Sequence, residues 1–179
     1  AGGSLFDCLE LLNMVSQGKI NVYAEPLIKN IGRYIYRTHI ADDYFINFAD
    51  GDAKIELYAE LVHRYGCRIE DTHLSNLGAA AFHQASGTMR IPGWYPMLRV
   101  LSHLMNFANL KAISATPPYV RDVWLDGIQV MAAREQGGSY QGLYLAAKGG
   151  HNDESHNHND VGQFVVYSYG QPVIIDVGV

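Results

Sequence analysis

A change of hydrophobic periodicity at Thr116-Pro117-Pro118 restricts the fold more than any other feature of this chain. Before it, apolar residues recur every three or four positions; after it, they recur at every second position. Helices followed by strands, without alternation, predict an all-α part joined to an all-β part. We therefore expect an α+β chain with two domains, residues 1–116 and 117–179.

The first part predicts five short helices. Apolar spacing, turn residues and capping residues place their boundaries at Leu5 to Gly18, from Pro26, Asp52 to Gly66, Thr72 to Ala81, and from Pro96. Because the connections are rich in turn residues, we expect consecutive helices to pack antiparallel.

The second part predicts five strands, at 120–125, 128–134, 140–147, 163–169 and 172–177. Asp126-Gly127 is a hairpin signal between the first two. Tyr169-Gly170 marks a turn between the last two.

Composition and charge exclude several classes of protein. With 48% hydrophobic residues the chain can bury a core, and disorder is not expected. The net charge of −5 and the scattered basic residues argue against nucleic acid as a partner. No apolar run approaches the roughly 20 residues that span a bilayer, so no membrane partner is expected. Cys8 and Cys67 lie far apart in apolar helical contexts and are expected to be buried free thiols.

Residues 151–162, with the sequence HNDESHNHNDVG, contain three of the chain's eight histidines and three acidic residues. No other segment gathers so many groups that can bind a metal or move protons near neutral pH. Gly149-Gly150 and Gly162 flank the run, and a strand pattern follows it. We therefore expect a loop at the end of a sheet, where catalytic groups often lie.

The spacing within this run suits a metal site, subject to one condition. His156 and His158 are two residues apart, so an extended backbone places both imidazoles on one face. Asp176 would lie on the order of 17 Å from them along a straight strand, which is too far for shared coordination. The site closes only if the chain turns at Asp160–Gly162. A zinc-like metal bound by His158 and Asp176 would need at least one further ligand, for which His151 and His156 are candidates. The competing interpretation is a solvated loop that binds nothing.

The remaining motifs favour structural roles. The other five histidines are separated along the part expected to be helical, and we interpret them as solvated or hydrogen-bonded. Asp50-Gly51-Asp52 lacks the spacing and the closing Glu of a calcium loop, so a turn plus a helix cap is the better explanation.

The histidine segment resembles the heparinase II/III-like family of polysaccharide lyases. The similarity rests on Gly149–Asn152, Ser155–Gly162, Phe164 and the segment Pro172–Gly178, together with Gly32–Tyr36 and Tyr44–Asp50 in the first part. The family joins an incomplete (α/α) toroid to an antiparallel β-sandwich. The resemblance thus implies the C-terminal part of a toroid followed by the first strands of a sandwich.

The resemblance also implies an activity and a set of residues. The family cleaves uronic-acid-containing polysaccharides by β-elimination: it removes the C5 proton and expels the 4-linked sugar. By this resemblance His156 is catalytic, and His158 and Asp176 bind a structural zinc that braces the loop. His151, Asn152 and Asn157 are substrate-binding candidates. An acidic polysaccharide or oligosaccharide would be the partner, and a periplasmic or secreted location is implied.

Some members of the family's site have no counterpart in this sequence. Its catalytic tyrosine and carboxylate-neutralising Asn or His are expected upstream of residue 1, and a further zinc histidine downstream of residue 179. We therefore expect a fragment that is inactive alone. A non-catalytic carbohydrate-binding or scaffold protein with a structural zinc loop is the main alternative. A metal-dependent cupin-like enzyme fits less well, because cupins do not place five helices before the sheet.

Overall fold

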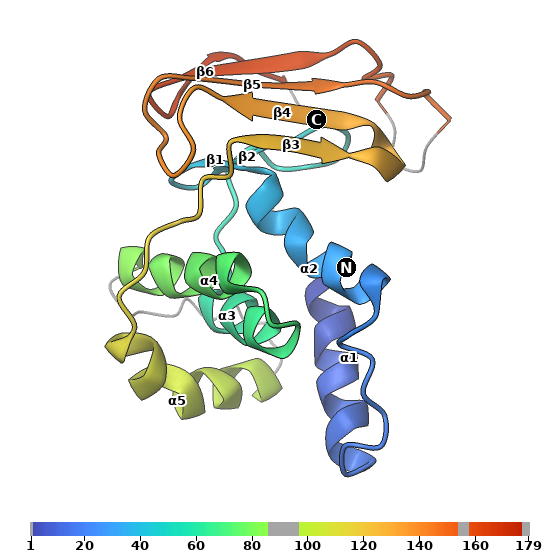
Figure 1. Cartoon of the computed structure of the whole chain (residues 1–179), viewed down its shortest axis with the longest axis vertical. Coiled ribbons are helices and arrows are strands. Elements are labelled where there is room, and N and C mark those ends of the chain that lie inside the picture. Colours follow the sequence, from blue (N-terminus) through green and yellow to red (C-terminus); the bar gives the residue numbers. More distant parts are fainter. Residues whose placement is uncertain (1, 86–96, 154–157, 177–179) are drawn as a thin grey trace. The chain divides into compact units, whose positions relative to one another are not determined.

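A computed structural model describes residues 2–85, 97–153 and 158–176 (Figure 1). The chain forms two compact units, which are described separately. Unit 1 comprises Ala1–Ile35 and Leu57–Pro118, and unit 2 comprises Tyr36–Glu56 and Tyr119–Val179. The change of periodicity near residue 117 thus coincides with the return of the chain to unit 2. Residues 36–56, which the sequence assigned to the helical domain, belong instead with the strands.

Unit 1 is helical. It contains α1 (Gly2–Val15), α3 (Ala59–Arg68), α4 (Thr72–Gln84), α5 (Met97–Ala112) and most of α2 (Pro26–Arg37). Pro26 opens α2 as predicted, since a proline in the first turn loses no helical hydrogen bond. The helix predicted from Asp52 was wrong: α3 begins at Ala59, and Lys54 instead forms an isolated bridge with Tyr44.

Two glycines let α3 and α4 pack closely. A Cβ at Gly66 would lie 2.3 Å from the Ser75 nitrogen, and one at Gly78 would lie 2.3 Å from the His63 nitrogen. These neighbours show that the two helices run antiparallel, as the short connection predicts. Asp71 caps α4 by accepting from the Leu74 amide at 3.0 Å.

Unit 2 is a five-stranded antiparallel sheet with one face covered by a hairpin (Figure 1). The sheet order is β3-β4-β5-β6-β7, so every strand pairs with its sequence neighbour. The bounds are Asp122–Leu125 (β3), Val130–Arg134 (β4), Leu143–Lys148 (β5), Phe164–Ser168 (β6) and Gln171–Ile174 (β7). All five predicted strands are confirmed, within three residues at each described end. Tyr169 and Gly170 both have positive φ (51° and 77°) in the two-residue turn between β6 and β7.

The hairpin of β1 (His39–Ala41) and β2 (Tyr44–Phe45) was not predicted. Its segment packs against one face of the sheet in a core cluster made of Ile40, Ile46, Val130, Ala132, Tyr144, Ala146, Val165 and Tyr167. Arg134 on β4 is 5% exposed, and its guanidinium donates to the carbonyls of His39 at 2.7 Å and Ile40 at 3.1 Å. These bonds fix the hairpin to the sheet.

The opposite face of the sheet is apolar and open in the described structure. Trp124 (54% exposed), Leu145 (39%) and Phe164 (46%) lie on it. Alternation along the strands produces this face, because neighbouring side chains point to opposite sides of a sheet.

Candidate functional site

The histidine run forms the loop between the adjacent strands β5 and β6, as the sequence predicts. Backbone hydrogen bonds close its base: the Lys148 amide donates to the Gln163 carbonyl, and the Gly162 amide donates to the Lys148 carbonyl, each at 2.9 Å. Gly150 and Gly162 have positive φ (82° and 88°), which explains why glycine flanks the run. The loop therefore leaves and re-enters the sheet at one place.

The turn at Asp160–Gly162, on which the metal hypothesis depends, is present. The Gln163 amide donates to the Asp160 carbonyl at 2.9 Å. The Asp160 side chain is 2% exposed, and its Oδ2 accepts from the Ala49 amide at 2.7 Å. A buried carboxylate bonded to a backbone N–H fixes the second half of the loop against the segment that follows β2.

His158 contacts the same segment. Its Nε2 lies 2.6 Å from Asp50 Oδ1. Sequence reasoning had assigned Asp50 to a turn and missed this partner. The two residues are 108 positions apart, so only the tertiary structure brings them together.

The other predicted site residues fall into three groups. His151 and Asn152 are exposed in the first half of the loop, where Asn152 Oδ1 accepts from the Val161 amide at 3.2 Å. Asp176 is 9% exposed and follows β7. His156 and Asn157 lie outside the described residues.

The zinc assignment stays a prediction. Among residues 2–85, 97–153 and 158–176, no three His, Cys, Asp or Glu side chains form a group that could hold a metal ion. His151, His158 and Asp176 have suitable chemistry, because zinc accepts imidazole nitrogen and carboxylate oxygen. A carboxylate on one ring nitrogen, as Asp50 provides for His158, is the usual support of a histidine that binds metal through its other nitrogen.

A buried histidine lies elsewhere in unit 2. His39 is 2% exposed and is on β1, not on a helix as the sequence indicated. Its ring stacks on Tyr119 at 5.3 Å between centroids, and its Nε2 lies 3.0 Å from the Asp42 carbonyl oxygen. Burial lowers the pKa of His39 to about 4, so the ring is neutral at physiological pH. It is a structural group of the core.

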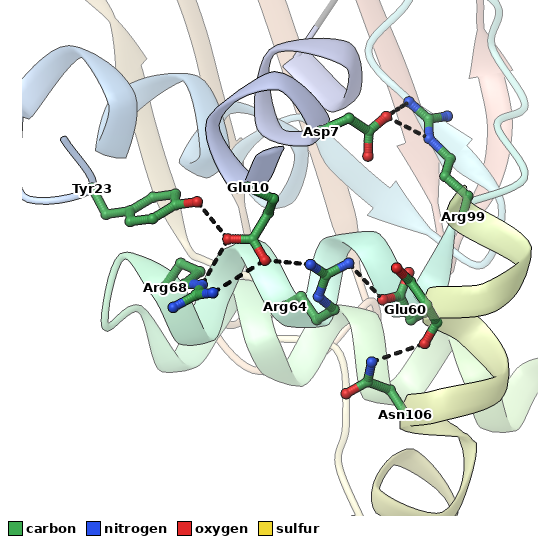
Figure 2. Close-up of polar contacts among 9 residues, drawn as sticks. Asp7, Glu10, Tyr23, Glu60, Arg64, Arg68, Arg99 and Asn106 are labelled. Carbon is green, nitrogen blue, oxygen red and sulfur yellow. Dashed lines mark hydrogen bonds and ion pairs between the residues drawn. The ribbon is translucent and has the colours of Figure 1, made fainter. Parts of the chain in front are cut away.

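Charged side chains in unit 1 form a network between α1 and α3 (Figure 2). The Glu10 carboxylate accepts from Tyr23, Arg64 and Arg68, and Arg64 also donates to Glu60 Oε1 at 3.0 Å. Burial alone would raise the pKa of Glu10, but its three hydrogen-bonding partners together hold it below the usual value. Burial raises the pKa of Glu60, which is 4% exposed. Because its members satisfy one another, we assign this network to stability.

A small cavity in unit 2 is lined by Tyr36, Arg37, Val120, Asp122, Val123 and Trp124. It combines a half-exposed indole with a cation and a carboxylate. That combination can stack on and hydrogen-bond to a small polar ligand such as a sugar.

No family model matches the chain, and no curated protein matches it. No helix in the described part of the chain is long and apolar enough to span a bilayer.

Proposed function

We propose that this chain is part of a polysaccharide lyase of heparinase II/III-like type, which cleaves uronic-acid-containing polysaccharide by β-elimination. The supporting observation is the histidine loop, closed at its base between β5 and β6 and held by Asp160 and His158 against residues 49–50. Such anchoring is what a loop needs if it is to present a catalytic group in a fixed position.

The open apolar face of the sheet is compatible with the same proposal. In a β-sandwich a second sheet covers such a face. A sandwich following the helices of a toroid is therefore the finer architecture that we propose.

The chemistry requires three groups. A base removes the C5 proton of the uronate, a neutralising group offsets the charge that develops on its carboxylate, and an acid protonates the leaving oxygen as the C4–O bond breaks. We assign one of the proton transfers to His156, because imidazole is the side chain whose ordinary chemistry best suits proton transfer near neutral pH. A second proton-transferring group and a group that neutralises the carboxylate charge complete the set that the reaction needs.

Zinc, if bound, would supply a structural brace. We propose His158 and Asp176 as its ligands, with Asp50 orienting His158. His151, Asn152 and Asn157 are proposed to contact substrate.

The decisive experiment measures the ultraviolet absorbance of the unsaturated uronate that the protein releases from polysaccharide. Heparan sulfate and alginate are the substrates. His156→Ala should abolish the absorbance increase while circular dichroism is unchanged. The matched control is His73→Ala, an exposed histidine on α4, which should retain full activity. Full activity in His156→Ala would contradict the proposal, as would the absence of any absorbance increase in the wild type.

The alternative is a non-catalytic carbohydrate-binding protein, and the cavity beside Trp124 favours it. In that case uronate oligosaccharides would bind without being cleaved, and Trp124→Ala would remove the binding measured by calorimetry. Cleavage that survives Trp124→Ala would exclude this alternative.

A further inference from the structure

A histidine and a cysteine lie one turn apart on α3, outside every site described above. His63 Nε2 is 3.5 Å from Cys67 Sγ. Residues four positions apart on a helix share one face, so their side chains can reach a common point. Cys67 and Cys8 are both exposed, so the prediction that the two cysteines are buried was wrong. His63 is half-buried, and the Cys67 sulfur is accessible to solvent.

A hydrogen bond at the other ring nitrogen, Nδ1, orients His63. Its Nδ1 lies 2.9 Å from the Ser75 carbonyl oxygen on α4, and because a carbonyl only accepts, Nδ1 is the nitrogen that carries the hydrogen. Nε2 therefore directs its lone pair toward Cys67. Metal-binding histidines are typically held in this way, through a hydrogen bond from the other ring nitrogen to a carbonyl or carboxylate.

The contact between α3 and α4 keeps Ser75 in place. Gly66 lies against the Ser75 backbone and Gly78 against the His63 backbone, both too closely for any Cβ. The histidine and its acceptor are thus fixed by two rigid helices rather than by a loop.

The separation of the two donor atoms matches a tetrahedral metal. With bonds of about 2.05 Å to nitrogen and about 2.3 Å to sulfur, a tetrahedral angle places the two donors about 3.6 Å apart. The observed separation of 3.5 Å is close to this value. The neighbouring cations on α3 are engaged elsewhere, because Arg64 and Arg68 both contact Glu10 (Figure 2).

We propose that His63 and Cys67 form a binding site for Zn²⁺ or a similar thiophilic divalent cation on the surface of unit 1. In the described part of the chain no third His, Cys, Asp or Glu joins them, so water completes the coordination. Binding replaces the thiol proton by the metal, with release of one proton to solvent.

Cobalt titration of the full chain tests the proposal, since Co²⁺ bound by thiolate has an intense charge-transfer absorption that a site of imidazole and carboxylate lacks. All variants carry His158→Ala, so that the histidine loop does not contribute. The band should appear and should be displaced by Zn²⁺. Cys67→Ala should abolish it, and His63→Gln should weaken cobalt binding at least tenfold. Circular dichroism checks that both variants fold.

The matched control is Cys8→Ala, which removes the other exposed free cysteine and should leave the titration unchanged. Nitrogen-15 NMR of His63 should report hydrogen on Nδ1 without metal and a shift of Nε2 on binding. The proposal is overturned if no charge-transfer band forms, if the band survives Cys67→Ala, or if Cys8→Ala removes it.

Discussion

The helical unit and the strand unit bury arginine in two different ways. In unit 1 the arginines meet carboxylates: Arg64 bridges Glu10 and Glu60, and Arg99 Nε donates to Asp7 Oδ2 at 2.8 Å (Figure 2). In unit 2 the Arg134 guanidinium is instead held by four backbone carbonyls, those of His39, Ile40, Val120 and Ser139.

The difference follows from the backbone. Carbonyls inside a helix already accept from the amide four residues later, so a buried cation there depends on acidic side chains. A short hairpin and its adjoining loops leave carbonyls available, and a guanidinium with five N–H groups can satisfy several at once. The ion pairs of unit 1 should therefore weaken when their carboxylates are protonated. The hydrogen bonds from Arg134 to backbone carbonyls should not depend on carboxylate protonation.

The largest effect should come from Arg134→Met, which retains the apolar stem but leaves four carbonyls without their donor. We expect the free energy of unfolding of unit 2 to fall by about 3–5 kcal/mol, measured by urea unfolding with hydrogen exchange to locate the loss. Arg134→Lys keeps the charge but has fewer donors, so its free energy of unfolding should lie between those of the wild type and Arg134→Met. A loss below about 1 kcal/mol for Arg134→Met would mean that the four hydrogen bonds to carbonyls contribute little to the stability of unit 2.

Acid should destabilise unit 2 through His39, whose ring is near Arg134 and the Asp42 carbonyl and carboxylate. Its pKa is about 4 when folded and about 6.5 when unfolded, so the unfolded state binds the proton first as the pH falls. Stability should therefore be complete above pH 6.5 and decline by about 3 kcal/mol toward pH 4. Unfolding at several pH values should show this slope in the wild type, and His39→Gln should lack it. An equal slope in His39→Gln would assign it to other groups.

Glu10→Gln should weaken unit 1 by about 2 kcal/mol at neutral pH, because a neutral amide cannot pair with two arginines. The pKa of Glu10 is lowered in the fold, so its contribution is present above about pH 4.5 and is lost as the pH falls through the folded value. The difference between variant and wild type should accordingly shrink in acid. Asp43→Asn is the control: its ion pair with Lys54 is exposed, and the change should stay within about 0.5 kcal/mol. A Glu10→Gln penalty independent of pH would contradict the ion-pair explanation.

The smallest effect on stability should come from Asp50→Asn. The Asp50–His158 pair is partly exposed, so we expect a loss below about 1 kcal/mol. If Asp50 orients His158 for zinc, however, the same change should lower zinc affinity about 10–100-fold, measured by competition with a chromophoric chelator. An unchanged affinity would remove Asp50 from the metal hypothesis.

Local pattern was sufficient to predict most elements of this protein. The strands could be predicted because alternation, the Asp126-Gly127 signal and the Tyr169-Gly170 turn are all short-range features. The loop location of residues 151–162 and the turn at Asp160–Gly162 also follow from neighbouring residues. Two predictions failed: the helix from Asp52, and the assignment of residues 36–56 to the helical part. Both failed because residues 39–45 pair as strands on the surface that the sheet of unit 2 supplies, and this surface is not visible in the local pattern.

Short-range sequence pattern was enough to predict that helices precede strands, that the histidine run is a loop between two strands, and that glycines flank this loop. These are consequences of periodicity and backbone conformation. Only the tertiary structure assigned residues 36–56 to the strand unit, supplied Asp50 and Ala49 as partners of the loop, and placed Ser75 behind His63. Those contacts join residues far apart in the chain, and packing, which no local pattern encodes, brings them together.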